Sequence, residues 1–188
     1  MASNYKKLLE LSLYISQKAG GDGYLGKTKL NKLLFLADFH YYLKTGKSIT
    51  GQTYLRFPKG PVPKDMKKVE ASTNDIAFQA VKFFNKDQQK PVALREPQLE
   101  EFAADEIDFV SELIDVVCSK NNVSASWLSD DSHEYIGWLL FPNGAEIPYN
   151  TIYLGKKDYQ KATEFDKVYA QKLRTTLGEN YGYGQKAL

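Results

Sequence analysis

A strongly periodic apolar stripe between residues 28 and 45 is the sequence feature that most constrains the fold. Its apolar side chains recur at i, i+3, i+4, i+7 and i+11: Leu30, Leu33, Leu34, Ala37 and Tyr41. This period is typical of an amphipathic helix and differs from the alternation of a strand. Thr28 is placed to cap the start of the helix, and Gly46 is placed to end it. The chain must therefore fold around a helix of about five turns.

Three further segments have helical periodicity, at residues 4–19, 105–120 and 157–176. The apolar face of residues 105–120 is broad, which predicts a helix in the centre of the domain. Shorter helices are expected in three places: from Pro63 to about Ala71, from a Ser124 cap to Leu128, and over residues 132–139.

β-forming residues predict extended segments at 48–57 and 145–154. Residues 76–84 and 90–95 predict a hairpin that is closed by the polar turn 85–89, although residues 76–84 also fit a helix. The chain is therefore expected to belong to the α+β class, as a mainly helical single domain with a small antiparallel β-sheet.

Length and composition narrow the class of protein. The chain has 188 residues, of which 43% are hydrophobic and 26% charged, and this suits one globular domain. Cys118 is the only cysteine, which excludes an intramolecular disulfide and a multi-cysteine zinc site. The first residues lack the apolar stretch of a signal peptide, and no apolar run approaches the roughly 20 residues of a membrane span. The sequence therefore predicts a cytoplasmic protein with no membrane segment.

Charge is distributed unevenly along the chain. Residues 1–90 carry 16 Lys/Arg against 7 Asp/Glu, a net charge of +9, whereas residues 91–188 carry 9 against 16, a net charge of −7. The favoured interpretation is that the two halves neutralise each other in the fold. A basic half also suits an acidic protein partner or nucleic acid. A nucleic-acid-binding regulator therefore stays as one hypothesis, although no known nucleic-acid-binding motif accompanies the lysines.

Residues Gly21–Thr28 match the phosphate-binding pattern G-x-x-x-x-G-K-[ST]. In that motif, backbone N–H groups bind the phosphates, and the residues placed as Lys27 and Thr28 bind the β/γ oxygens and Mg²⁺. The motif works only after a buried strand, whereas residues 4–19 have the period of a helix. We favour a glycine-rich connection between two helices, with a P-loop-like nucleotide-binding enzyme as the competing hypothesis.

Two other patterns are tempting as active sites. Residues 129–134 bring together hydroxyl, carboxylate and imidazole groups, but neighbours in sequence rarely converge as a hydrolytic triad requires. Capping of a short helix by Ser129 or Asp130 explains this segment more simply. Cys118 lies in the apolar face of its helix, which is typical of a packing cysteine. We therefore predict no catalytic residue, no cofactor site and no metal site, and a protein that is not an enzyme.

Several motifs taken together resemble the Panacea domain, the SocA-like antitoxin domain that also occurs in phage-associated GepA-type proteins. In chain order they are the run Lys29 to His40, the segment Thr45 to Thr50, Tyr54, the loop Lys59-Gly60-Pro61-Val62-Pro63, the segment Ser132 to Trp138, and Glu146-Ile147-Pro148-Tyr149. The resemblance covers residues 4–154. Residues 155–188 are expected to form a C-terminal helix and a flexible, glycine-rich tail of the same domain.

The resemblance implies an antitoxin that neutralises a cognate protein toxin by direct binding. The toxin is expected to be encoded by the adjacent gene, with phage defence as the biological setting. SocA-type proteins also act as adaptors that deliver a toxin to the ClpXP protease, so a proteolytic adaptor is the alternative within the same class. No cofactor is implied in either case.

The residues expected to bind the partner lie in or beside the matched motifs: Asp38, Tyr54, Lys59, Pro61, Pro63 and Lys64. The rigid loop from Gly60 to Pro63 would lose little conformational entropy on binding. The competing interpretation is intramolecular. In that case the loop fixes the turn between a strand and a helix, Tyr54 and Trp138 belong to the core, and Asp38 pairs with a nearby lysine.

Overall fold

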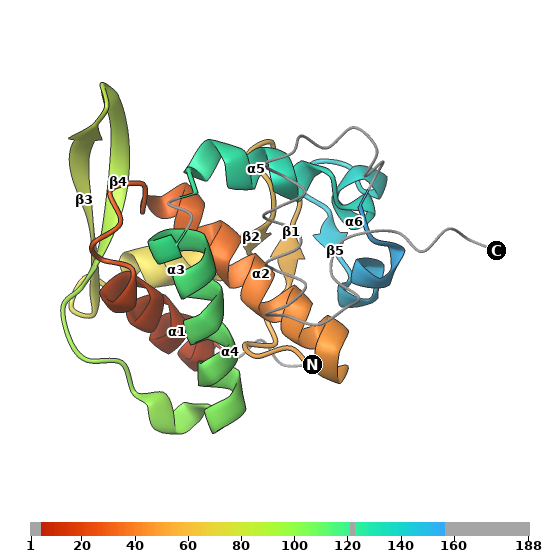
Figure 1. The fold of residues 1–188 in the computed structure, drawn as a ribbon, viewed down its shortest axis with the longest axis horizontal. Coiled ribbons are helices and arrows are strands. Elements are labelled where there is room, and N and C mark those ends of the chain that lie inside the picture. Colours follow the sequence, from red (N-terminus) through yellow and green to blue (C-terminus); the bar gives the residue numbers. More distant parts are fainter. Residues whose placement is uncertain (1–4, 121–122, 157–188) are drawn as a thin grey trace.

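The computed structural model describes residues 5–120 and 123–156, which form a helical body with two small sheets (Figure 1). The α-helices are α1 (Tyr5–Lys18), α2 (Lys27–Thr45), α3 (Met66–Ala71), α4 (Ala104–Ile114), α5 (Ala125–His133) and α6 (Ile136–Leu140). The strands are β1 (Tyr54–Leu55), β2 (Val62–Pro63), β3 (Ile76–Phe83), β4 (Lys86–Ala93) and β5 (Glu146–Ile147). The α+β class is confirmed. The helix and tail predicted within residues 155–188 lie almost wholly outside the described residues.

Helix α2 runs through the middle of the molecule, as its periodic stripe predicted (Figure 1). Every residue from Lys29 to Tyr41 is buried, so the helix is enclosed on all sides and not only along its apolar stripe. It ends as expected at Gly46, whose φ of 74° is in the left-handed region and whose N–H donates to the carbonyl of Tyr42. The prediction that Thr28 caps the start of the helix was wrong. Gly26 precedes the first turn, and Thr28 lies inside the helix.

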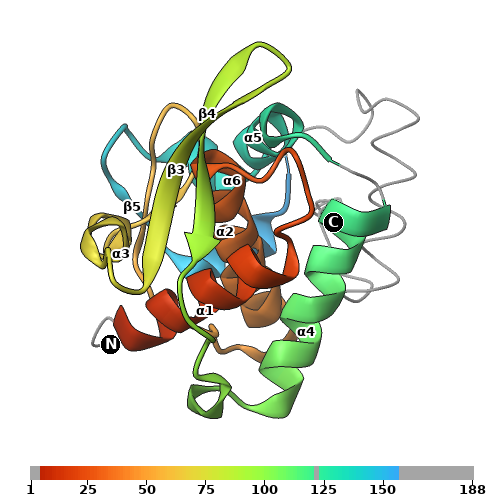
Figure 2. The same ribbon diagram turned by 90° about the vertical axis from the view of Figure 1, so that its left-hand side faces the viewer.

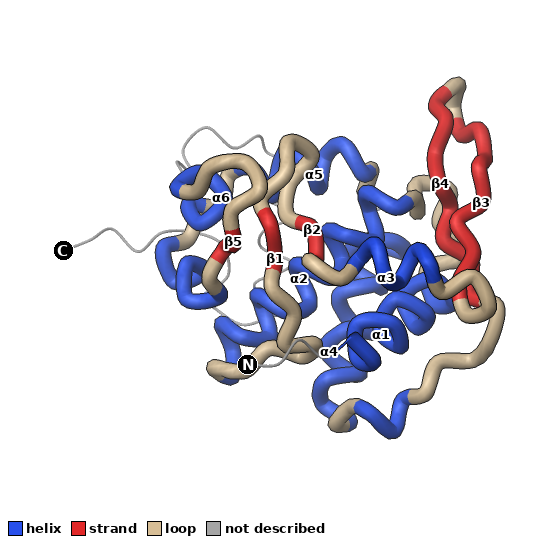
Figure 3. Tube along the Cα trace, turned by 180° about the vertical axis from the view of Figure 1, so that it is seen from behind, coloured by secondary structure: helices blue, strands red, loops and turns tan. Residues whose placement is uncertain are grey.

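The five strands form two separate sheets. Strand β1 is the centre of a three-stranded antiparallel sheet in the order β2-β1-β5, and Tyr54 pairs with both Pro63 and Ile147. Figure 3, which views the molecule from behind, shows these three strands side by side in front of helix α2. Strands β3 and β4 form a hairpin at one end of the molecule, beside α1 and α3 (Figure 2). The predicted hairpin is confirmed, but its turn is Phe84–Asn85 and not residues 85–89.

Two segment boundaries differ from the predictions because tertiary contacts decide them. Pro63 pairs with Tyr54 in the sheet, so the following helix begins only at Met66. Residues 145–154 are extended only at β5, and a 3₁₀-helix, η3 (Tyr149–Leu154), follows. The helix predicted over residues 105–120 continues from α4 into a π-helical segment, η2 (Asp115–Lys120).

Ion pairs join the basic and acidic parts of the chain, as the favoured interpretation of the charge pattern proposed. Lysines of α1 pair with carboxylates in or near α4, in the pairs Lys6–Glu101, Lys7–Glu106 and Lys18–Asp115. A short 3₁₀-helix, η1 (Leu99–Glu101), contributes one of these carboxylates. These three ion pairs therefore neutralise part of the acidic half of the chain within the fold.

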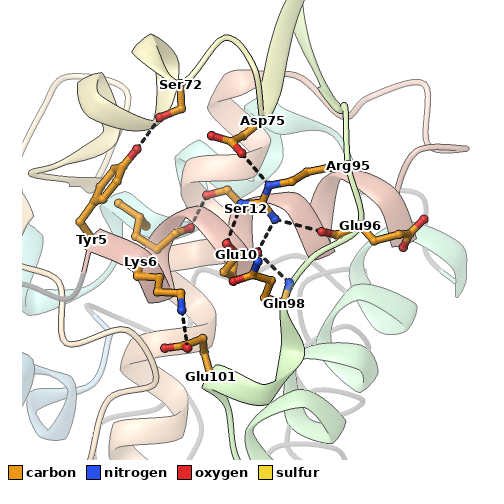
Figure 4. Close-up of polar contacts among 11 residues, drawn as sticks. Tyr5, Lys6, Glu10, Ser12, Ser72, Asp75, Arg95, Glu96, Gln98 and Glu101 are labelled. Atoms are coloured by element: carbon orange, nitrogen blue, oxygen red, sulfur yellow. Dashed lines mark hydrogen bonds and ion pairs between the residues drawn. The ribbon is translucent and has the colours of Figure 1, made fainter.

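A buried carboxylate on α1 anchors both ends of the β3–β4 hairpin (Figure 4). Glu10 is 1% exposed, and its two carboxylate oxygens accept hydrogen bonds from the Arg95 guanidinium at 2.7 and 2.8 Å. Arg95 follows β4, and it also donates to Asp75, which precedes β3, at 2.6 Å. The backbone N–H of Gln98 donates to Glu10 at 2.8 Å. One guanidinium therefore ties the base of the hairpin to the helical body.

Substitution Arg95→Met tests this anchor. It leaves the Glu10 carboxylate buried without its cation, and we expect the free energy of unfolding at pH 7 to fall by about 2 kcal/mol, because Arg95 is partly exposed to solvent. Lys6→Met, which removes the exposed pair with Glu101, is the control and is expected to leave stability nearly unchanged. Urea unfolding of both variants measures the difference. A loss in Lys6→Met as large as that in Arg95→Met would contradict the assignment.

The same anchor makes stability depend on acid pH. Burial by itself raises the pKa of Glu10, but the hydrogen bonds from Arg95 and Gln98 outweigh it and lower the pKa below its usual 4.5. A lowered carboxyl pKa stabilises the fold fully above pH 4.5, and that contribution is lost as the pH falls through the lower value. We expect this acid loss in the wild-type protein and a smaller one in Arg95→Met.

Candidate partner-binding site

The loop between β1 and β2 is held from below by a buried carboxylate on α2. Asp38 has no exposed surface and accepts hydrogen bonds from the Thr50 backbone N–H at 2.7 Å, from the Thr50 hydroxyl, and from the Tyr54 hydroxyl at 2.7 Å. Burial raises the pKa of Asp38, and these donors oppose the rise. Because Tyr54 is the central residue of the β2-β1-β5 sheet, Asp38 fixes the strand from which the loop leaves.

A glycine lets the loop close directly over helix α2. The Gly60 N–H donates to the Phe57 carbonyl at 2.8 Å, and the φ of Gly60 is 98°. A Cβ at this position would lie 2.1 Å from the Lys32 Nζ and 2.5 Å from the Ser132 Oγ. Only glycine meets both demands, the positive φ and the close approach. The turn is therefore packed against α2 and α5 at once.

Lys32, below this turn, is 1% exposed. Within residues 5–120 and 123–156 its ammonium has no hydrogen-bond or ion-pair partner. Burial lowers the pKa of Lys32 to about 7. His133 lies close enough for the charge of Lys32 to act on it, and burial together with that charge lowers the pKa of His133. The His133 Nε2 is buried with no hydrogen-bond partner in the part of the chain that the structure describes.

Arginine and aromatic side chains form the outer wall of the loop. The Arg56 guanidinium lies 4.1 Å from the centre of the Trp138 ring, and the His133 ring stacks on the same indole with a centroid separation of 4.0 Å. The Trp138 Nε1 donates to the Phe57 carbonyl at 3.2 Å. These contacts lock the loop onto α6, and cation–π and stacking contacts of this kind preorganise flexible side chains.

The six predicted partner-binding residues divide by exposure. The side chains of Lys59 and Lys64 are exposed, and Lys64 makes only a surface ion pair with Glu146 at 3.2 Å. Asp38, Tyr54, Pro61 and Pro63 are buried and offer no side-chain surface to a partner in this conformation. The structure thus brings all six to one loop and its support. Their role in partner binding stays a prediction, and only the two lysines are placed for direct contact.

Sequence reasoning did not select the apolar surface beside the loop. Phe57 is 37% exposed, and Leu139 and Leu140, which follow Trp138 on α6, are 42% and 62% exposed. We call Arg56, Phe57, Lys59, Trp138 and Leu140 the loop face. Aromatic, arginine and apolar side chains together are typical of the energetic centre of a protein interface. The early signals were Trp138, at the end of a matched motif, and the adjacent Arg56-Phe57 pair before a proline, and each is weak by itself.

The other motifs have structural roles in the described residues. Residues 21–26 connect α1 to α2, so a helix and not a buried strand precedes the glycines. Lys27 and Thr28 begin α2, and Lys27 pairs with Glu70 at 2.6 Å. Ser129 donates to the Lys59 carbonyl at 2.9 Å and thereby holds the loop. The predicted Ser124 cap is confirmed, since its hydroxyl accepts from the Trp127 N–H, but α5 extends to His133. Cys118 is buried, and burial raises its pKa to about 12.

Two kinds of feature are absent from the described residues. Within residues 5–120 and 123–156, no group of three His, Cys, Asp or Glu side chains is arranged to hold a metal ion. Nor do these residues contain a helix with the length and apolar character that a membrane span needs.

Comparison with known families identifies the class of protein. The family described as "Antitoxin SocA-like, Panacea domain" matches residues 30–139, which is more than half of the chain. The chain therefore belongs to this family, and membership indicates an antitoxin role. The comparisons with curated proteins and with solved structures gave no significant match.

The matched segment begins inside α2 and ends inside α6. Leu8 of α1, and Ile147 and Ile152 beyond α6, belong to the same hydrophobic core although they lie outside the match. This packing supports the wider domain predicted from residue 4 to residue 154, which stays a prediction.

Lys32, whose ammonium has no partner within the described residues, gives a stability test of this site. Its usual pKa is 10.5, so between about pH 7 and pH 10.5 the unfolded chain binds a proton that the folded protein does not. Stability therefore rises with pH across that window. Lys32→Met keeps the aliphatic stem and removes the ammonium, and we expect it to raise the free energy of unfolding at pH 7 by about 1–3 kcal/mol and to abolish the rise.

Lys29→Met is the matched control for this test. Lys29 is equally buried but bonds to Asp22 and to the Val123 carbonyl. Its removal strands the Asp22 carboxylate, so this variant should be less stable than the wild type. Denaturation at pH 7 and pH 9 distinguishes the two lysines. Destabilisation by Lys32→Met would contradict the account of Lys32.

Proposed function

We propose that this protein is an antitoxin that neutralises a cognate protein toxin by direct binding, in the cytoplasm and with no chemical step. Family membership supports the antitoxin role. The observation that best supports direct binding is the loop face. Its exposed side chains Phe57, Lys59 and Leu140 belong to a surface whose internal contacts are already formed in the free protein.

The supports of the loop explain why this face suits binding. Ser129 holds the Lys59 carbonyl, and Trp138 and the Gly60 N–H both hold the Phe57 carbonyl, so the backbone between residues 57 and 60 is fixed at two points. A surface that is already ordered loses little conformational entropy when a partner binds. Lys59 and Lys64 add positive charge at its edge, and charge complementarity would steer an acidic toxin surface toward it.

Co-expression with the protein encoded by the adjacent gene tests the function. We expect the neighbour alone to stop growth, and this protein to restore growth and to co-elute with the neighbour on a sizing column. Growth rescue that needs a protease and leaves no stable complex would contradict direct neutralisation and would favour the adaptor. A neighbour that is harmless by itself would overturn the proposal.

Charge reversal tests the two exposed lysines of the loop. We expect Lys59→Glu together with Lys64→Glu to weaken toxin binding about tenfold, mainly through slower association, since rim charges act on encounter. The control is Lys47→Glu with Lys44→Glu, which makes the same charge change at exposed lysines around the far end of α2. Surface plasmon resonance measures both pairs. Equal weakening in the two would show a general charge effect and contradict a site at the loop.

A further inference from the structure

The tip of the β3–β4 hairpin projects beyond the rest of the molecule (Figures 1 and 3). Its base is held by the buried Ile76 and by the Arg95 anchor. Its ladder runs without interruption from the pair Ile76–Ala93 to the pair Phe83–Lys86. The hairpin therefore carries its tip on a rigid arm.

The tip has an unfavourable residue in a strained position. Phe84 and Asn85 have φ angles of 46° and 59°, so both lie in the left-handed region, as a two-residue type I′ turn requires. Asn, Asp and Gly suit this turn, whereas a bulky residue with positive φ is an outlier. Such strain persists at sites where the side chain serves a function. Asn85 fits the turn by itself, and Phe84 does not.

The strained residue is also the most exposed large hydrophobic side chain among the described residues, at 76%. Its ring packs against Phe83, with centroids 4.6 Å apart, and stacks at 6.3 Å on Tyr24 from the α1–α2 connection. Phe83 lies where a Cβ on Gly23 would clash at 2.3 Å. The three rings therefore form an ordered aromatic cluster at the end of the arm, with Phe84 outermost.

The charges around the rings indicate the chemistry of a partner. Lys82 and Lys86 are exposed on either side of the turn, and neither belongs to an ion pair within residues 5–120 and 123–156. Asp87 is the one carboxylate beside them. An apolar tip between two lysines complements an apolar pocket with a carboxylate rim. Two free lysines next to a carboxylate are poor for nucleic acid, which is bound through many phosphate contacts.

We propose that the hairpin tip, with Phe84 as its anchor, inserts into an acidic-rimmed apolar pocket on the protein toxin. This inference rests on the proposed function and adds a second contact, at the opposite end of the matched domain from α6. Phe84 supplies the buried hot spot, and Lys82 and Lys86 face the carboxylates of the rim. The loop face and the hairpin tip would then hold the toxin at two points.

Turn chemistry allows a test that separates binding from folding. Phe84→Asn removes the ring and suits a type I′ turn, so the melting temperature should stay the same or rise. We expect its affinity for the purified product of the adjacent gene to fall by at least about tenfold. Phe84→Gly, which relieves the same strain, is the second variant. Asn85→Gly keeps the ring, also suits the turn, and should bind like the wild type.

Each outcome decides the inference. Weak binding by folded Phe84→Asn and Phe84→Gly, with normal binding by Asn85→Gly, supports it. Wild-type affinity in either folded Phe84 variant overturns it while leaving the proposed function intact. A wild-type protein that does not bind the neighbour overturns the proposed function and this inference together. Loss of binding to a 20-nucleotide single strand, with unchanged toxin affinity, would overturn it in favour of nucleic acid.

Discussion

The burial of helix α2 is the constraint on which the rest of the structure depends. A helix enclosed from Lys29 to Tyr41 must find partners for the polar side chains that it carries, because an unpaired buried polar group is costly. Lys29 binds Asp22 and the Val123 carbonyl, Asp38 binds Thr50 and Tyr54, and the His40 Nε2 bonds to the Tyr135 hydroxyl at 2.8 Å. Each pair fixes one connecting segment against the helix.

Those polar pairs explain how a buried helix determines the position of the exposed loop between β1 and β2. The hydrogen bond from Tyr54 to Asp38 fixes the position of β1, and the loop begins where β1 ends. Gly60 then lets the loop close over Lys32. The helix thereby specifies the position of the exposed residues of the loop. Lys32 is the exception among the buried charges, because its ammonium is stabilised by no carboxylate in the described residues, and its lowered pKa reports that cost.

The sequence predicted what local periodicity controls and missed what distant contacts control. The helix α2, the hairpin and the helix at 105–120 were all predicted from the sequence, because the spacing of apolar residues follows the backbone repeat. The start of α3 and the 3₁₀-helix after β5 were not, since pairing of Pro63 and Ile147 with Tyr54 decides them. The matched motifs predicted a partner-binding role for residues that the structure gathers at one loop, and that role stays a prediction. Burial of Asp38 and Tyr54, and exposure of Phe84, depend on tertiary packing.

Hydrogen–deuterium exchange of the protein alone and in complex with the product of the adjacent gene tests the central claim most directly. The account predicts slower exchange in the complex at two separate segments, residues 56–64 and 82–88, with no change in the enclosed part of α2. A stable complex whose protection lies wholly outside both segments would contradict the account.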